Sequence, residues 1–402
     1  MQVSGFKKLT PSIIVLLVIL GMFLALRRLD ILWLVLGIIS FLLILGVIKV
    51  EEIRSLKWEL VALLLVPLFL GMSGISSGLE NQLLGIDVAF VMISPTIGFM
   101  VMFNLHHHTS FKVNFPFAIF FVFVFSLASG GLIGIGEFLS DLYLGTNFLR
   151  SNYDLMMDLI AIALGSIPMG LFFTRYIRKS KYDSIQSLTS PLGVSTEKTS
   201  NKAVEILFSG FGHKGNNWAP LLSRSLQILI LIFAMLAIYW RNPRWFFSSI
   251  LSFGVTLVPR IFTKNMNIVI PPLLNLWICG ALFLHVIGGV MGFYDDVFWW
   301  DHLTHFVSAA LISILGFTIL LTITRLSDTL HIPNFVIPII ILLFILATGV
   351  VWEIFEFFAD ELLGTHMQYG LEDTAFDMIY NIFGAGFASL VGYRYFLSEA
   401  NK

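Results

Sequence analysis

The chain has 402 residues, of which 57% are hydrophobic and 12% are charged. This composition excludes an ordinary soluble domain. The 24 basic and 25 acidic residues nearly balance, and this sum indicates nothing about partners because the distribution of charge matters. The single cysteine, Cys279, excludes an intramolecular disulfide and a cysteine-based metal site. Runs of about 20 apolar residues, each long enough to cross a bilayer as a helix, recur along the chain. We therefore expect an all-α polytopic membrane protein.

Twelve apolar segments follow one another along the chain. In the first half they are residues 11–26, 31–48, 60–76, 87–104, 116–136 and 155–176. In the second half they are residues 225–240, 245–260, 268–291, 302–323, 335–357 and 374–396. Several are short, so the expectation is about 12 transmembrane helices. Six spans per half would give both halves the same orientation, which predicts two tandem parallel six-helix repeats.

An internal repeat supports this division. Residues 125–176 align without a gap on residues 344–395, and 18 of the 52 positions are identical. The shared residues include the acidic pairs Glu137/Glu356, Asp141/Asp360, Asp154/Asp373 and Asp158/Asp377. Acidic side chains are costly in or near a bilayer, so a retained pattern of them indicates a functional site. The first copy has Gly134 where the second has Glu353, which predicts a degenerate site in the first copy.

The expected domains are an N-terminal six-span repeat at residues 1–176, a polar cytoplasmic linker at 177–222, and a C-terminal six-span repeat at 223–402. With the N-terminus placed in the cytoplasm, 19 of the 24 Lys and Arg residues lie on the cytoplasmic side. The positive-inside rule therefore predicts a multi-pass plasma-membrane protein with both termini in the cytoplasm. In this topology the acidic helix ends face the outside of the cell.

Six side chains at three helix ends of the second half are candidate metal ligands and catalytic groups: Asp301, His305, Glu353, Glu356, Asp373 and Asp377. The paired residues are three or four positions apart, so each pair shares a helix face, whereas the neighbouring His302 is expected to point elsewhere. If the three faces meet, up to five carboxylates converge on one imidazole, and such a cluster needs a cation or protons. Carboxylates with one imidazole predict a divalent metal ion, with Zn²⁺, Mn²⁺, Fe²⁺ and Mg²⁺ all compatible.

Simpler interpretations stay open for single residues. Asp301 and Asp373 each stand at the start of an expected helix and could cap it. Capping explains poorly why residues inside helices, such as Glu353 and Asp377, are acidic. His285, in the middle of a span, is expected to form a polar contact between helices rather than to bind metal.

The order of these residues resembles that of the VanZ-like and YjdF-like families of integral membrane proteins. The residues that carry the resemblance, within 290–396, are Asp301/His305, Glu353/Glu356, Gly364, Asp373-Thr374, Asp377 and Gly384-Ala385. VanZ-like proteins are associated with resistance to glycopeptide antibiotics such as teicoplanin by a route that is not established. The resemblance therefore implies that the acids and His305 matter, and it implies no particular reaction.

Three functions are compatible with this pattern. A metal-dependent enzyme could act on a lipid or a lipid-linked envelope substrate, with the metal activating water or polarising a phosphoryl or acyl oxygen. A proton- or cation-coupled transporter could use two parallel halves with intramembrane carboxylates. A non-catalytic membrane scaffold could use the same acids to cap helices and hold a structural ion. The expected partners are membrane lipids, and no nucleic acid is expected.

Overall fold

The structure is a computed structural model that describes residues 16, 18–27, 31–49, 57–75, 88–179, 218–261, 270–327 and 330–400. Over these residues every named element is a helix. Among the described residues, Lys112 and His331 form one isolated antiparallel β-bridge. The all-helical expectation is therefore confirmed for the residues that the structure describes.

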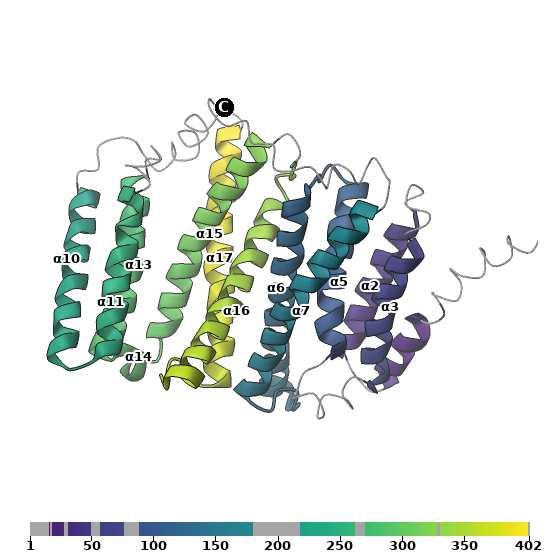
Figure 1. The fold of residues 1–402 in the computed structure, drawn as a ribbon, viewed down its shortest axis with the longest axis horizontal. Coiled ribbons are helices and arrows are strands. Elements are labelled where there is room, and N and C mark those ends of the chain that lie inside the picture. The colour runs from purple at the N-terminus through teal and green to yellow at the C-terminus, as the bar shows by residue number, and fades with distance from the viewer. Residues whose placement is uncertain are drawn as a thin grey trace, which may run out of the picture. The chain divides into compact units, whose positions relative to one another are not determined.

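The chain forms two compact units, and the first contains residues 1–193, 329–333 and 346–375. Its helices are α2 (Ile31–Lys49), α3 (Lys57–Ser73), α5 (Val88–His108), α6 (Phe115–Leu144) and α7 (Asn152–Lys179). It also holds the longer part of α16 (Ile337–Leu363) and the first turn of α17 (Leu371–Ala400). In this unit α5 packs against α2, α3, α6 and α7 (Figure 1).

The second unit contains residues 194–328, 334–345 and 376–402. Its helices are α10 (Trp218–Tyr239), α11 (Pro243–Thr256), α13 (Pro272–Met291), α14 (Phe293–Asp296) and α15 (Trp300–Leu326), with the start of α16 and most of α17. The helices α10, α11 and α13 pack against one another pairwise, and α13 also contacts α14 and α15. The four-residue helix α14 joins α13 to α15, and it begins after Gly292, whose positive φ of 78° suits a glycine.

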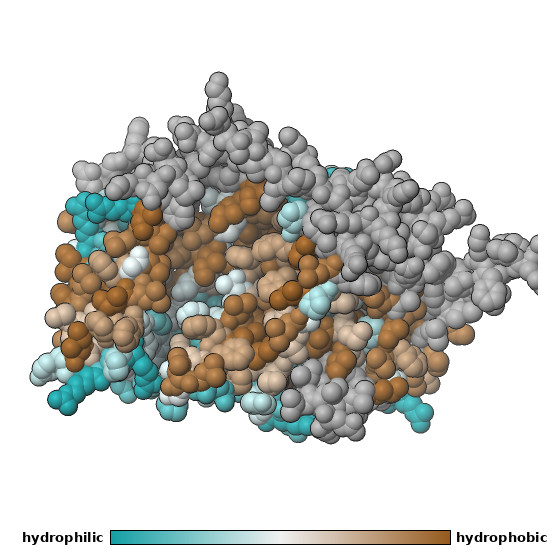
Figure 2. All heavy atoms as spheres, viewed as in Figure 1, coloured by the Kyte–Doolittle hydropathy of each residue, from teal (hydrophilic) through white to brown (hydrophobic). Residues whose placement is uncertain are grey.

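Six of the described helices are long and apolar enough to cross a membrane. They are Val88–His108, Pro116–Leu144, Trp218–Tyr239, Pro272–Met291, Trp300–Leu320 and Ile337–Leu363. Figure 2 shows the surface over α10, α11 and α13 as brown across the middle and teal at both ends, as lipid contact requires. The described parts of the other expected segments, from residues 18–27 to α17, are helical as well. An architecture of about 12 spans in tandem six-helix repeats stays a prediction.

The predicted domain boundaries, at residues 176/177 and 222/223, also stay predictions. Most of the expected linker, residues 180–217, lies outside the described residues. Both α16 and α17 contribute to the two compact units, so the units do not divide the chain at one point.

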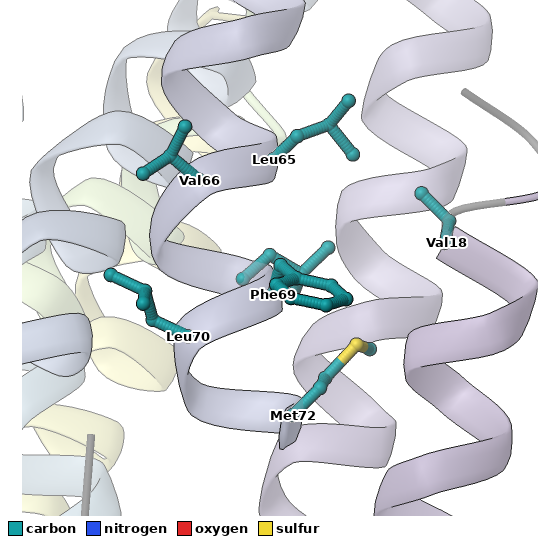
Figure 3. A pocket seen from close by; sticks show the side chains of 7 residues that line it. Val18, Leu65, Val66, Phe69, Leu70 and Met72 are labelled. Carbon is teal, nitrogen blue, oxygen red and sulfur yellow. The ribbon is translucent and has the colours of Figure 1, made fainter. Parts of the chain in front are cut away.

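A cavity of about 310 Å³ in the first unit is lined by apolar side chains (Figure 3). It is lined by Val18, Leu65, Val66, Leu68, Phe69, Leu70 and Met72. The side chains labelled in Figure 3 are hydrocarbon except for the sulfur of Met72. The lining therefore offers no group for acid–base chemistry or for metal binding.

The helix end at Asp141 is closed by a loop that folds back onto the carboxylate. Asp141 accepts hydrogen bonds from the hydroxyl of Thr146 at 2.6 Å and from the backbone amides of Phe148 and Leu149 at 2.8 and 2.9 Å. Between them Gly145 takes a left-handed φ of 66°, which a glycine adopts without strain.

The same arrangement recurs 219 positions later. Asp360 accepts hydrogen bonds from the hydroxyl of Thr365 and from the amides of Met367 and Gln368, the amides at 2.8 and 2.9 Å. The intervening Gly364 again has a left-handed φ, of 62°. Asp141 and Asp360 thus serve the closure of loops, and each has its acceptor oxygens occupied by its own loop.

We predict that Asp360→Ala lowers the free energy of unfolding by about 1–3 kcal/mol, because the carboxylate accepts three hydrogen bonds from one loop. The neighbouring exposed Glu361 provides a matched control as Glu361→Ala. Thermal unfolding of the two purified variants in detergent measures the difference. Equal midpoints would show that the loop bonds add nothing to stability.

Candidate metal centre

The candidate site lies where α15 and α17 approach each other closely in the second unit. A methyl group placed on Gly384 of α17 would overlap the backbone oxygen of Phe306 and lie 2.9 Å from Cβ of Ala309. Only a glycine at this position permits the approach, as is common where membrane helices pack. Asp377 and Asn381 precede Gly384 by seven and three positions, about two turns and one turn of helix.

Asp301, His305 and Asp377 converge at this contact. Nε2 of His305 lies 3.4 Å from Oδ1 of Asp301 and 3.7 Å from Oδ2 of Asp377. One potential ligand atom from each of the three residues lies within 4.8 Å of the other two. The side chains of Asp301, His305 and Asp377 are 19%, 10% and 2% exposed, so the cluster is largely shielded and Asp301 is its most accessible member.

His305 and Asp301 are each held by a further polar side chain. Nδ1 of His305 lies 3.4 Å from the amide oxygen of Asn381, and the hydroxyl of Thr304 donates to Asp301, with the backbone oxygen at 2.8 Å and Oδ1 at 3.2 Å. With the oxygen of Asn381 facing Nδ1, the neutral imidazole carries its hydrogen on Nδ1. Its Nε2 lone pair then faces two carboxylates, an arrangement that is favourable only with a cation or a proton between them.

Asp377 is also held by a further side chain, and this partner was not expected. Nδ1 of His302 lies 3.6 Å from Oδ1 of Asp377, and the His302 ring stacks on Tyr380 with centroids 4.5 Å apart. The expectation that His302 points away from the site was wrong. His302 and His305 are three positions apart on α15, so the two imidazoles flank the Asp377 carboxylate from one helix.

Three further predicted ligands, Glu353, Glu356 and Asp373, belong to the first unit. Glu353 is 1% exposed, and its Oε2 accepts a hydrogen bond from Nε2 of Gln368 at 3.0 Å. Gln368 also donates to the backbone oxygen of Glu353, and its side-chain oxygen accepts from Asn152 at 3.0 Å. Glu353 is therefore tied, within its own unit, to the loop after α16 and to the start of α7.

Glu356 and Asp373 have local partners as well. Glu356 accepts from the indole nitrogen of Trp352 at 2.9 Å, one turn earlier on the same helix. Asp373, in the first turn of α17, accepts from the backbone amide of Tyr369 at 3.1 Å, which agrees with a capping role. Asp301 does not cap α15, because Trp299 occupies the N-cap position.

Thr304, His302 and Tyr294 belong to the polar network around the cluster, and the spacing of residues on single helices did not predict them. Hydroxyl and aromatic residues are common in membrane helices, so nothing in the sequence marks these three. His285 does form the expected polar contact between helices, because its Nε2 lies 3.2 Å from the hydroxyl of Ser248 on α11.

The helices and the cluster define a multi-pass helical membrane protein with a polar site between two helices of its second unit. A family described as "Predicted membrane protein (DUF2238)" matches residues 221–398, which include α15 and all but the last residues of α17. A Thermotoga maritima protein described as "Uncharacterized protein" is 32% identical over 140 residues, or 34% of this chain and 70% of that protein. The chain belongs to this family of membrane proteins.

No solved structure matches the chain. The family match agrees with the expectation of an uncharacterised membrane protein family, and it gives no support to VanZ-like proteins in particular.

We predict that Gly384→Ala separates α15 from α17 and lowers the free energy of unfolding by about 1–3 kcal/mol, because the added methyl overlaps a backbone atom. Gly386→Ala on the same helix is the control, since nothing lies within 4 Å of a methyl at that position. Thermal unfolding in detergent compares the two variants. If both unfold with the wild-type midpoint, the close approach at Gly384 is not a constraint.

Proposed function

We propose that Asp301, His305 and Asp377 form a divalent-metal centre, and that the protein is a metal-dependent enzyme acting on lipid or lipid-linked envelope substrates. One observation carries this proposal. The Nε2 atom of His305 lies 3.4 and 3.7 Å from oxygens of two carboxylates, while Thr304, Asn381 and His302 each contact one of the three candidate ligands. Ligands of protein-bound metals are usually held in this way by further partners.

Three protein ligands suit catalysis better than a purely structural role, because they leave a coordination position open for water or substrate. A bound divalent metal would supply a Lewis acid that activates water or polarises a phosphoryl or acyl oxygen. Asp301 is the ligand through which water reaches the site, since its side chain is the most exposed of the three. The donor set of one imidazole and two carboxylates accepts Zn²⁺, Mn²⁺, Fe²⁺ or Mg²⁺.

The position of the centre suits an amphipathic substrate. Asp301 lies in the first turn of α15, two positions after the exposed Trp299 and three after the exposed Phe298. Aromatic side chains at helix ends are typical of the headgroup level of a bilayer, where a lipid headgroup meets the protein. In the expected topology this level is on the outside of the plasma membrane, with both termini in the cytoplasm.

The internal repeat forms part of the proposal. The equivalent loops at Asp141 and Asp360 support a common origin of the two copies, within an architecture of about 12 spans. The first copy has Asp158 at the position of Asp377 but no histidine that corresponds to His305. We assign the metal centre to the second copy alone.

We predict that the purified wild-type protein binds about one divalent metal ion per chain, and that His305→Ala and Asp377→Asn each lose it, because each removes one of three ligands. Asp158→Asn is the matched control in the first copy and keeps the metal. Elemental analysis of the purified proteins in detergent measures the content. The protein is also incubated with Zn²⁺, Mn²⁺, Fe²⁺ and Mg²⁺ in turn. If the wild type holds no stoichiometric metal before or after these incubations, the proposed centre is ruled out.

We predict further that an extract of envelope lipids incubated with the metal-loaded protein yields a new product, which mass spectrometry detects. His305→Ala abolishes the product while keeping the wild-type elution volume and unfolding midpoint. If metal binds but no product forms, and pH- or cation-dependent flux appears in proteoliposomes, the centre belongs to a transporter instead. Metal without either activity indicates a structural ion in a scaffold.

A further inference from the structure

A chain of hydrogen bonds extends from the candidate metal centre into the neighbouring helices of the same unit. The hydroxyl of Ser248 on α11 lies 3.2 Å from Nε2 of His285 on α13, and Nδ1 of His285 lies 2.9 Å from the hydroxyl of Tyr294 on α14. The Tyr294 hydroxyl donates to the hydroxyl of Thr304 at 3.5 Å, and Thr304 donates to Asp301. Four helices therefore contribute to a path that ends on a candidate ligand.

Counting hydrogens gives this chain one direction. The one hydrogen of the Thr304 hydroxyl faces the backbone oxygen of Asp301 at 2.8 Å and its Oδ1 at 3.2 Å, and both oxygens can only accept, so Thr304 donates to Asp301 and itself accepts from Tyr294. Tyr294 then accepts the Nδ1 hydrogen of a neutral His285, whose Nε2 accepts from Ser248. Every group donates toward Asp301, and successive hydrogen bonds in such a chain polarise one another.

Tyr294 and the neighbouring Trp245 pack against a part of α13 where two glycines leave room for their rings. A methyl group on Gly289 of α13 would overlap the indole of Trp245, and one on Gly288 would overlap the indole of Trp300 and lie 2.8 Å from the ring of Tyr294. The rings of Trp245 and Tyr294 are parallel within 4°, with centroids 6.1 Å apart. Two consecutive glycines thus let the aromatic rings lie against α13 beside His285.

We infer that Tyr294 and His285 are positioning residues of the metal centre, which hold Asp301 through Thr304. This inference rests on the proposed metal centre. Asp301 is the most exposed of the three candidate ligands and the one nearest the end of its helix, so it has the most freedom to turn away. Thr304 contacts the same Oδ1 atom, at 3.2 Å, that lies 3.4 Å from Nε2 of His305.

The test is a titration of the full-length protein in detergent with Co²⁺, whose visible absorption spectrum reports the ligand geometry. Tyr294→Phe keeps the ring and removes the hydroxyl, and it should weaken Co²⁺ binding about 10- to 100-fold and change the spectrum, as loss of an outer partner does. The unfolding midpoint without metal should stay close to that of the wild type. Tyr239→Phe, which removes an exposed hydroxyl at the end of α10, is the matched control and should leave both unchanged.

A second variant separates positioning from packing. His285→Leu interrupts the same chain one link further away, so it should weaken binding by a similar factor, and the double variant should be no weaker than either single one. His285→Asn keeps a donor near the position of Nδ1 and should restore part of the affinity. If the fold-losses of Co²⁺ affinity in the two single variants multiply in the double variant, the two residues act independently and the inference is overturned.

The outcomes also separate this inference from the metal centre itself. A wild-type protein that takes up no Co²⁺ removes both the centre and its positioning residues. A wild-type protein that binds Co²⁺, with a Tyr294→Phe variant of equal affinity and equal spectrum, leaves the centre in place and refutes the positioning role. A weaker variant whose unfolding midpoint falls as well, without a spectral change, assigns Tyr294 to packing alone.

Discussion

The carboxylate of Asp377 sets the strongest physical constraint on the second unit. It is 2% exposed on a helix that packs within an apolar bundle, where an isolated negative charge would cost several kcal/mol. The two imidazoles of α15 offset part of this cost, because His302 faces Oδ1 of Asp377 and His305 faces Oδ2. Either a protonated histidine or a bound cation can balance the negative charge of Asp377. Because Asp301 adds a second carboxylate beside the same imidazole, a divalent cation balances the charge of the cluster better than one proton does.

This balance depends on how closely the two helices approach. The imidazoles of α15 reach Asp377 because Gly384 lets the backbone at Phe306 lie against α17. A larger residue at Gly384 would move the ligands apart before it changed any of them. The cluster therefore depends on close contact between two helices, and Gly384 is as necessary to it as the candidate ligands are.

The sequence predicted what depends on one helix or on composition. Helical content followed from the apolar runs, and the pairing of Asp301 with His305 followed from their spacing of four. The structure also brings Asp377 to this pair, as expected. What depends on contacts between helices could not be read from spacing. His302 faces α17 because of how α15 is rotated, and Glu353 is bound to Gln368 because the loop after α16 folds back.

The acids that the two copies share are therefore of two kinds, and identity between copies does not separate them. Asp141 and Asp360 keep the same hydrogen bonds to their own loops, so their retention needs no chemistry beyond folding. Asp158 and Asp377 are equally well retained, and Asp377 has Asp301 and His305 of α15 beside it. Because α15 presents Asp301, His302 and His305 toward α17, and α17 presents the Asp377 carboxylate, the proposed metal centre is assigned to that helix pair.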